Sequence, residues 1–326
     1  MNALLCTAFG PLENLEVREI QPPRPGPGQV LVDVKAASLN FPDVLMAQGL
    51  YQVKPPLPFS PGTEIAGVIV EVGTDVRGFR AGDRVSAIAG WGGFAEACAV
   101  DAGWVTPLPG GMDFETGAAF LFTYETSLHA LRDRGRLEAG ETLLVLGAAG
   151  GVGLAAVEIG KVMGARVIAA ASSEEKLALC RKVGADETIN YAFGNLRDRV
   201  KERTGGKGVD VVYDPVGGPY TESALRATAW GGRLLVVGFA AGDIPKIPIN
   251  LALLKERSII GVYWGDSVKQ DPEGHLRNVK RLMEWFASGK VRPSISERVP
   301  LSEAAAAMRR MVHRQVKGKV VILPEA

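Results

Sequence analysis

The sequence has 326 residues, of which 47% are hydrophobic and 22% are charged, and its formal net charge is +1. The length suggests two domains, and the near-neutral charge gives no electrostatic reason to expect nucleic acid or a membrane surface as a partner. Three widely spaced cysteines predict a reducing, cytoplasmic location without disulfides. We expect no signal peptide, because residues 1–10 lack a basic region and a long apolar core.

The first part of the chain, up to about residue 122, has short strand-like runs broken by Pro and Gly. Val30, Val32 and Val34 recur at every second position, as expected of a strand with one buried face. The stretches PPRPGPG at 22–28 and GFRAGDRV at 78–85 read as turns that lead into further strands. This pattern predicts a compact, barrel-like β domain.

Residues 60–73, SPGTEIAGVIVEVG, place Glu64 at the start of an apolar run. A carboxylate there can be a metal ligand, a catalytic group or part of the scaffold. Zinc needs three or four Cys, His or acidic ligands at workable spacing, and the three histidines are isolated from one another and from any cysteine. The sequence therefore predicts no metal site, and we interpret Glu64 as a scaffold group that bonds backbone or a basic side chain.

From residue 141 onward, strand-like and helical runs alternate. This alternation predicts a parallel, doubly wound sheet with right-handed crossovers. After residue 264 the chain is helical at 279–290, and it ends in a strand at 319–324 that we expect to return to the first domain. The strand-like runs are 142–147, 165–171, 187–191, 209–217, 232–239 and 258–264, and the helical runs are 151–163, 174–184 and 195–206.

The stretch LGAAGGVG at 146–153 predicts a phosphate-binding loop. Its glycines at 147, 150 and 153 differ from the G-x-G-x-x-G spacing by one inserted residue before the middle glycine. The stretch follows a strand, opens a helix and begins a βαβ unit, which is the context of a dinucleotide site. The helix N-terminus favours an anion there. The alternative is a glycine turn that only tightens strand–helix packing.

The end of the second strand predicts which dinucleotide binds. NAD sites usually place an acid there for the ribose 2′-hydroxyl, whereas this chain has Ser172 and Ser173, followed by Lys176. Hydroxyls and a positive charge suit a 2′-phosphate, so the sequence favours NADPH. Either serine can also cap the next helix, and both roles can hold together. Tyr191 either lies against the adenosine phosphate or is a core or edge tyrosine.

Taken together, these features resemble the medium-chain dehydrogenase/reductase superfamily and, within it, the zinc-free NADPH:quinone oxidoreductase (zeta-crystallin-like) branch. The resemblance implies an α/β chain with a GroES-like β-rich catalytic domain (1–122 and 265–326) and a Rossmann NADPH-binding domain with a doubly wound parallel sheet (123–264). The motifs are AASLNFPDVLMAQGLY (36–51), PGTEIAGVIVEVG (61–73), GDRV (82–85), GGFAEACAV (92–100), LGAAGGVG (146–153), YDPVGG (213–218), VVGF (236–239) and GKVVILP (318–324).

The resemblance also implies site residues. It places Asn40 near the substrate, beside Asp43 and Tyr51, and allows Thr126 to bond the nicotinamide or its ribose. Asn40 can equally cap a turn, and Thr126 can be a satisfied threonine within a helix. The implied cofactor-binding residues are Ala149, Gly150, Gly151, Val152, Gly153, Ser172, Lys176, Tyr191, Gly238, Phe239, Val262, Tyr263 and Arg314.

The same resemblance bears on the chemistry. Zinc alcohol dehydrogenases of the superfamily carry Gly-His-Glu where this chain has Gly62, Thr63 and Glu64, and a cysteine ligand expected near 39–40 is missing. An alkoxide is hard to stabilise without a Lewis acid, so we expect hydride transfer from NADPH to a quinone or an α,β-unsaturated carbonyl. The alternatives are an enoyl-thioester (acyl-CoA) reductase and a non-catalytic NADPH-binding protein. We expect a homodimer that pairs through an exposed edge at 258–264.

Overall fold

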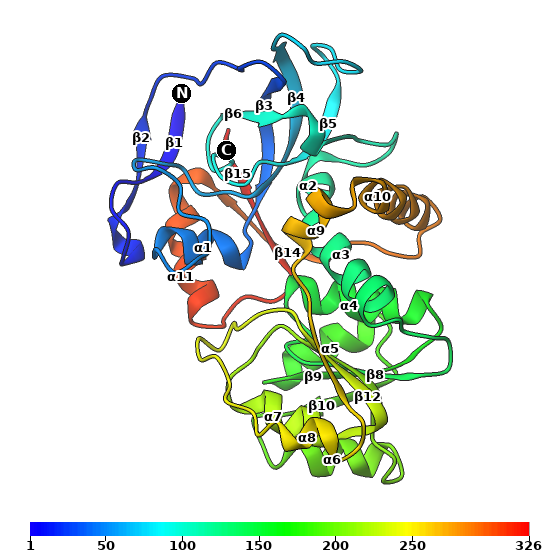
Figure 1. The fold of residues 1–326 in the computed structure, drawn as a ribbon. Helices are drawn as coiled ribbons and strands as arrows, with labels where there is room; N and C mark the ends of the chain where they lie inside the picture. The colour runs from blue at the N-terminus through cyan, green and yellow to red at the C-terminus, as the bar shows by residue number, and fades with distance from the viewer. Residues whose placement is uncertain (326) are drawn as a thin grey trace. The chain divides into compact units, whose positions relative to one another are not determined.

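The computed structural model describes residues 1–325, which form two compact units (Figure 1). Unit 1 comprises residues 1–122 and the end of the chain from residue 293, and unit 2 comprises residues 123–292. Helix α3, Leu121–Leu128, begins at the end of the first segment of unit 1 and continues into unit 2. Within the described residues, we find no helix with the length and apolar character needed to span a bilayer.

Unit 1 is built on a sheet of mostly antiparallel strands in the order β14-β15-β3-β4-β5-β7, with β6 also paired to β3 and a separate β1–β2 pair. Its elements are β1 Asn2–Cys6, η1 Leu12–Asn14, β2 Leu15–Glu19, β3 Gln29–Ser38, α1 Phe41–Ala47, β4 Glu64–Val72, β5 Arg84–Ile88, β6 Ala97–Asp101, η2 Ala102–Trp104, β7 Val105–Pro107, α2 Phe114–Ala118, β14 Ile295–Pro300, η4 Leu301–Glu303, α11 Ala304–Val312 and β15 Lys319–Leu323.

The last strand of the chain returns to unit 1, as the sequence predicted. In β15, Val321 pairs with Ser38 and Ile322 pairs with Ala37, both on β3. The alternation predicted for β3 is also confirmed, because Val30, Val32 and Val34 are fully buried in the core of the unit. The β3–β4 pair is unusually close at Gly67, where an added Cβ would lie 1.9 Å from the Asp33 carbonyl oxygen, so only glycine fits there.

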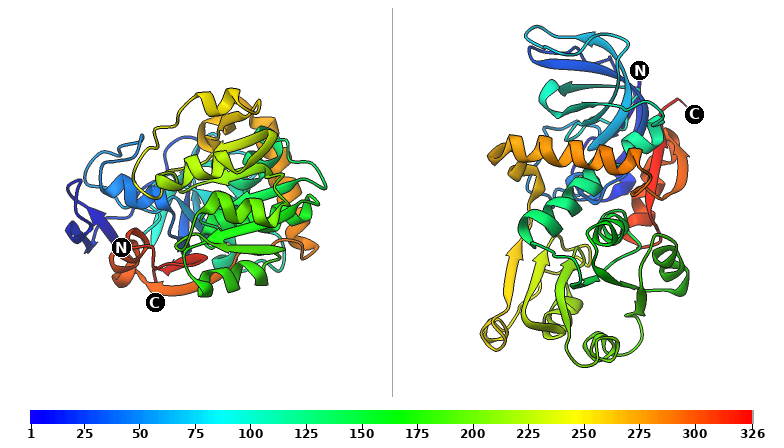
Figure 2. Two further views of the ribbon diagram at one scale, coloured as in Figure 1. Left: turned by 90° about the horizontal axis from the view of Figure 1, so that it is seen from below. Right: turned by 90° about the vertical axis from the view of Figure 1, so that its right-hand side faces the viewer.

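Unit 2 contains a six-stranded parallel sheet in the order β10-β9-β8-β11-β12-β13, with helices on both faces (Figure 2). This is the doubly wound order. Strands β8 to β10 are added toward one edge of the sheet and β11 to β13 toward the other, so the strand order reverses between β8 and β11. Its elements are η3 His129–Arg134, β8 Thr142–Val145, α4 Gly151–Val162, β9 Arg166–Ala171, α5 Glu174–Lys182, β10 Glu187–Asn190, α6 Leu196–Arg203, β11 Val209–Asp214, α7 Pro219–Arg226, β12 Thr228–Val236, α8 Asn250–Leu253, β13 Ser258–Gly261, α9 Trp264–Gln270 and α10 Pro272–Ala287.

Residues 265–292 group with unit 2, whereas the sequence placed them in the catalytic domain. The difference has a physical basis, because α10 is bonded to the helical segment that precedes β8. Asn278 on α10 donates to an Asp133 oxygen at 3.0 Å, and His275 is hydrogen-bonded to Glu125 on α3. The first boundary, between residues 122 and 123, coincides with the predicted one.

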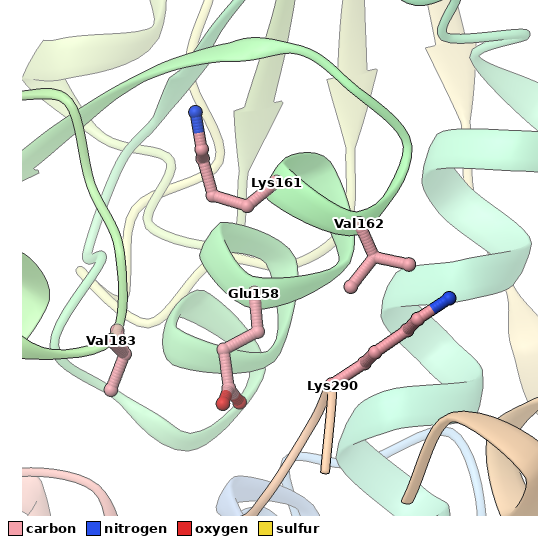
Figure 3. A pocket seen from close by; sticks show the side chains of 5 residues that line it. All are labelled: Glu158, Lys161, Val162, Val183 and Lys290. Atoms are coloured by element: carbon pink, nitrogen blue, oxygen red, sulfur yellow. The ribbon is translucent and has the colours of Figure 1, made fainter. Parts of the chain in front are cut away.

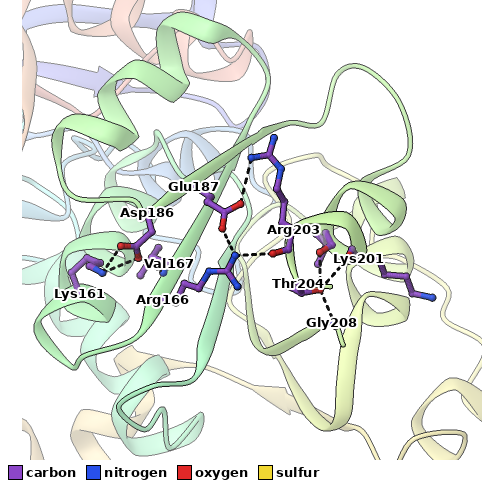
Figure 4. A network of polar contacts seen from close by, with 10 residues as sticks. Lys161, Arg166, Val167, Asp186, Glu187, Lys201, Arg203, Thr204 and Gly208 are labelled. Atoms are coloured by element: carbon purple, nitrogen blue, oxygen red, sulfur yellow. Dashed lines mark hydrogen bonds and ion pairs between the residues drawn. The ribbon is translucent and has the colours of Figure 1, made fainter. Parts of the chain in front are cut away.

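The amino edge of the unit 2 sheet, where the strands start, carries a network of charged side chains (Figure 4). Lys161 on α4 bonds both oxygens of Asp186 at 2.8 Å. Arg166 and Arg203 both pair with Glu187 at the start of β10. Exposed pairs of this kind contribute about 0–1 kcal/mol each to the stability of the folded chain. The network is therefore a minor source of stability for unit 2.

All three cysteines are buried and none forms a disulfide. Cys6, Cys98 and Cys180 are at most 3% exposed. Burial raises the pKa of Cys98 and of Cys180 to about 12, and it also raises the pKa of Cys6. The thiols are therefore protonated at neutral pH.

Candidate functional site

The glycine loop lies at the carboxyl edge of the unit 2 sheet, where the parallel strands end. Gly147 follows β8 with φ +56°, and Gly150 caps the N-terminus of α4. A Cβ on Gly153 would lie 2.4 Å from the Gly147 carbonyl oxygen, and one on Gly147 would lie 2.8 Å from the Val216 side chain. Side chains are thus excluded at Gly147 and Gly153, and a glycine turn that opens a helix in this way favours close approach of a phosphate.

Ser172 and Lys176 come together at the end of β9, the next strand of the sheet. The Lys176 ammonium lies 3.5 Å from the Ser172 hydroxyl. The Ser173 hydroxyl accepts a hydrogen bond from the Lys176 backbone N–H at 3.3 Å and so caps α5. Of the two exposed glutamates that follow, Glu174 pairs with Arg181 on the same helix. A hydroxyl and an ammonium therefore stand where a ribose-binding carboxylate would be.

Tyr191, Gly238 and Val262 each follow the end of a parallel strand. The Tyr191 N–H donates to the Ala171 carbonyl at 3.1 Å, and its ring centroid lies 4.5 Å from that of Tyr220. The Gly238 N–H donates to Asp214, and the Val262 N–H donates to the carbonyl at the end of β12. The aromatic neighbours in the chain, Phe239 and Tyr263, are exposed. The predicted residues after these strands thus lie at the same carboxyl edge as the glycine loop.

Asp214 organises this edge and was not among the predicted site residues. It ends β11 at the point where the strand order reverses, and it is 2% exposed. One carboxylate oxygen accepts the N–H groups of Val216 and Gly217, both at 2.9 Å, and the other accepts the Thr221 hydroxyl at 2.6 Å. Burial raises its pKa, and these bonds oppose the rise. The motif YDPVGG was the signal that could have identified it.

Three further predicted residues lie on or after helices and do not follow a strand of the unit 2 sheet. Thr126 is on α3 in unit 2, between the buried residues Glu125 and Ser127. Tyr51 follows α1 and packs on the core of unit 1, and Arg314 follows α11 with φ +59°. Tyr51 and Arg314 belong to unit 1, so the roles of all three toward a cofactor stay predictions.

Asn40 lies in a buried polar cluster inside unit 1. Its side chain is 4% exposed, and its amide oxygen accepts a hydrogen bond from the Lys319 ammonium at 2.7 Å. Its amide nitrogen lies 3.3 Å from both the Thr63 hydroxyl and a Glu64 oxygen. Both ends of the amide therefore have partners within unit 1, and its predicted role toward a substrate is not addressed by these contacts.

Glu64 is a scaffold group, as predicted. One of its oxygens accepts the Phe122 N–H at 2.9 Å. The other accepts the Ser38 hydroxyl at 2.7 Å and lies 3.4 Å from the Lys319 ammonium. Lys319 was not predicted, although a lysine that opens a buried strand was visible in GKVVILP. Burial lowers its pKa, and the charges of Glu64 and Asp43 oppose that effect.

Asp43 fixes the start of α1. One carboxylate oxygen accepts the Asn40 N–H at 2.8 Å, and the other accepts the Gly62 N–H at 3.2 Å. The helix begins at Phe41, and Asn40 is its N-cap residue. Burial raises the pKa of Asp43 to about 7, against the opposing effect of its hydrogen bonds and of the Lys319 charge.

A shallow pocket of about 300 Å³ on unit 2 contains none of the predicted site residues (Figure 3). Its only acid, Glu158, is bonded to the Tyr124 hydroxyl and to the Arg292 N–H at 3.2 Å. Burial raises the pKa of Glu158 to about 7. We interpret this carboxyl as a structural group of unit 2. The lining residues are Glu158, Lys161, Val162, Val183 and Lys290.

Two family models match the chain. Residues 26–110 match the alcohol dehydrogenase GroES-like domain, and residues 151–283 match the zinc-binding dehydrogenase model. The first match falls in unit 1 and the second in unit 2. The fold and these matches define a dehydrogenase of the two-domain type.

Curated relatives are similar over most of the chain. A quinone oxidoreductase-like protein 2 homolog from Nematostella vectensis is 41% identical over 300 residues, which cover 91% of this chain and 82% of the relative. Quinone oxidoreductase-like protein 2 from Mus musculus is 38% identical and covers 98% of this chain and 91% of its own. The chain therefore belongs to the medium-chain dehydrogenase/reductase superfamily and is a quinone oxidoreductase-like oxidoreductase.

Solved structures agree on the fold and differ in the activities they name. Escherichia coli quinone oxidoreductase complexed with NADPH matches with a TM-score of 0.93 and 29% identity, over 99% of this chain and 100% of that one. An NAD-dependent alcohol dehydrogenase matches with a TM-score of 0.89 and 33% identity, and CurK enoyl reductase with 0.88 and 28%, each over 99% of this chain and at least 98% of its own.

Proposed function

We propose that this protein transfers hydride from NADPH to a quinone or an α,β-unsaturated carbonyl and uses no metal ion. The observation that carries the proposal is the pairing of Ser172 with Lys176 at 3.5 Å, at the strand end next to the glycine loop. A cation and a hydroxyl at this position suit the 2′-phosphate of NADPH, whereas a ribose diol is usually held by a carboxylate.

The cofactor is NADPH, in agreement with the NADPH-bound quinone oxidoreductase to which the chain is similar. NADPH supplies the hydride when bound, and the protein supplies binding and orientation. Residues 149–153 would hold the pyrophosphate through backbone N–H groups at the start of α4. Ser172, Lys176 and Tyr191 would hold the adenosine end, with Arg314 as a further proposed contact. Near the nicotinamide we propose Gly238, Phe239, Val262 and Tyr263.

We further propose that Thr126 and Tyr51 orient the nicotinamide and the acceptor. The placement of Asn40 supports an indirect role, because its amide is bonded to Lys319, Thr63 and Glu64. An acceptor that is already electron-poor can take hydride without a Lewis acid, whereas an alcohol oxidation has to stabilise an alkoxide. This contrast favours quinones and enones over alcohols.

The test is a turnover assay that follows loss of NADPH absorbance with 1,4-benzoquinone, 9,10-phenanthrenequinone and 2-alkenals. We expect turnover with at least one of them and a clear preference for NADPH over NADH. Equal dissociation constants for NADPH and NADH would contradict the role of Ser172 and Lys176. Tight NADPH binding without any turnover would favour a non-catalytic NADPH-binding protein instead.

An enoyl-thioester reductase is the second candidate, supported by the similarity to CurK enoyl reductase. This activity uses the same cofactor and also adds hydride to an electron-poor double bond, so the unit 2 site does not distinguish the two. A crotonyl thioester tested beside a simple 2-alkenal would separate them. Turnover of the thioester alone would replace the quinone assignment.

We also propose a homodimer in the cytoplasm. Strand β13 pairs only with β12 and so forms an edge of the unit 2 sheet, and Ile259 on it is 38% exposed. An apolar, unpaired edge favours pairing with a second copy of the chain. Light scattering at micromolar concentration should give a dimer for the native protein and a monomer for Ile259→Lys. Ile244→Lys, at an exposed position in the loop after β12, serves as the control.

A further inference from the structure

Two buried hydroxyls in unit 2 are hydrogen-bonded in series to the glycine loop. The Ser127 hydroxyl on α3 donates to the Val152 carbonyl at 2.9 Å, and the Tyr213 hydroxyl on β11 lies 3.0 Å from the Ser127 oxygen. A serine has one hydroxyl proton, and a carbonyl can only accept. The Ser127 proton is therefore directed at Val152, and Tyr213 is the donor to Ser127.

Tyr213 also contacts the other end of the loop, through its backbone. It is in register with Val145 on the parallel strand β8, and its carbonyl accepts the Leu146 N–H at 3.0 Å. Leu146 directly precedes Gly147, where the loop begins. Tyr213 is thus bonded to the start of the loop by its backbone and, through Ser127, to the end of the loop by its side chain.

The bond to Val152 acts on a peptide group at the start of α4. This helix begins at Gly151, and its Leu154 N–H donates to the Gly150 carbonyl at 2.8 Å. The N–H groups that precede such a bond have no partner within the helix, and they point toward an anion bound at the N-terminus. The Val152 carbonyl and the Gly153 N–H belong to one planar peptide group. A donor that fixes the carbonyl therefore also fixes the direction of that N–H.

Burial makes the two hydroxyls depend on each other. Ser127 and Tyr213 are both fully buried, and a buried hydroxyl is costly unless it is hydrogen-bonded. Burial raises the pKa of Tyr213 above its ordinary value, against the opposing effect of the bond to Ser127. The phenol is therefore protonated at neutral pH and available as a donor.

We propose that Ser127 and Tyr213 are positioning residues for the cofactor, because they hold the peptide group between Val152 and Gly153 in the orientation that a pyrophosphate needs. This inference rests on the part of the proposed function that places the pyrophosphate at residues 149–153, and it does not depend on which acceptor is reduced. Tyr213 acts through Ser127, so its hydroxyl matters only while Ser127 is present.

Calorimetric titration of the full chain with two ligands tests the proposal. NADPH carries the pyrophosphate, whereas 2′-AMP carries only the adenosine and the 2′-phosphate that Ser172 and Lys176 would hold. Ser127→Ala should weaken NADPH binding roughly 3- to 10-fold, as expected for one hydrogen bond, and leave 2′-AMP binding unchanged. Tyr213→Phe should weaken NADPH binding by less, and it should have no further effect when added to Ser127→Ala.

Ser86→Ala is the matched control. It removes a buried serine hydroxyl on β5 of unit 1 that donates to the Gly117 carbonyl at 2.8 Å, and it should change neither affinity. All three substitutions remove little more than a hydroxyl, so we expect each variant to fold.

Unchanged NADPH affinity in Ser127→Ala, or an equal loss of affinity for NADPH and 2′-AMP, would overturn the proposal. Effects of Ser127→Ala and Tyr213→Phe on NADPH affinity that simply add would overturn the role of Tyr213. A native chain that binds no NADPH would overturn the cofactor site and this inference together. NADPH binding without turnover, with the expected difference between the two ligands, would support the inference and contradict only the proposed reaction.

Discussion

The glycine loop of unit 2 and the polar cluster of unit 1 solve opposite problems. At Gly147 and Gly153 the close packing of the turn leaves no room for a side chain. Around Lys319 the side chains of Asn40 and Glu64 bond one another and leave little for a ligand. One region depends on positions that have no side chain, whereas the other depends on side chains that are hydrogen-bonded to one another. We therefore expect the two regions to respond differently to substitution.

The largest effect is expected from Glu64→Gln. The substitution keeps the shape but removes the countercharge that is hydrogen-bonded to the buried Lys319 ammonium, and breaking a buried pair in this way costs about 3–5 kcal/mol. Urea unfolding of the full chain measures the loss. Glu71→Gln, at an exposed position on the same strand, is the control and should change stability by less than about 0.5 kcal/mol. Equal losses of unfolding free energy in Glu64→Gln and Glu71→Gln would mean that the side chains of the cluster do not depend on one another.

Gly153→Val tests the loop from the opposite direction, because it adds a side chain where the backbone leaves no room. The new Cβ would lie 2.4 Å from the Gly147 carbonyl oxygen, and such overpacking costs about 1–3 kcal/mol. Isothermal titration should show NADPH affinity reduced at least about tenfold. Gly265→Ala, which meets nothing within 4 Å, should leave both quantities unchanged. Unaltered NADPH binding in Gly153→Val would move the site away from this loop.

Lys176→Met separates the two cofactors. Removing the ammonium takes away a charged hydrogen bond worth about 1.5–3 kcal/mol, so NADPH affinity should fall roughly 10- to 100-fold while NADH affinity stays the same. Dissociation constants from fluorescence titration give the answer. Lys182→Met, exposed at the end of the same helix, is the control. A parallel loss of NADH affinity would indicate that Lys176 supports the helix and not the 2′-phosphate.

Glu158→Gln gives the smallest effect, and it appears in the pH dependence. The pKa of Glu158 is about 7 in the folded chain and near its ordinary 4.5 when unfolded. Its favourable contribution is therefore complete below pH 4.5 and is lost as the pH rises through 7. The native protein should lose about 1–2 kcal/mol over this range relative to the variant, after allowance for partial exposure. Denaturant midpoints of both proteins that run parallel from pH 4.5 to 7.5 would contradict this.

The sequence signals for the proposed unit 2 site are local. The glycines lie together at 147–153 and Ser172 lies close to Lys176, and Tyr191, Gly238 and Val262 lie at or near the ends of strand-like runs. The parallel sheet then brings the strand ends to one edge, which is a general property of the fold. Within the glycine loop and the serine–lysine pair, closeness in the sequence therefore predicts closeness in space.

The unit 1 cluster was only partly predictable because its key contact is not local. Lys319 and Asn40 are 279 residues apart, and a lysine is almost never fully buried unless paired. The sequence identified Glu64 as scaffold but could not identify its partner. The sequence also could not show that residues 265–292 group with unit 2, since the amphipathic face of a helix does not reveal which unit it packs on.

The burial of the three cysteines affects how the chain resists alkylation by the proposed substrates. Quinones and enones alkylate thiolates, and a thiolate forms readily only where the thiol is exposed or its pKa is low. Cys6, Cys98 and Cys180 are buried, and burial raises the pKa of each. We expect mass spectrometry to find the folded chain unmodified after repeated turnover with benzoquinone. If the chain reduces such electrophiles as proposed, it offers them no reactive thiolate of its own.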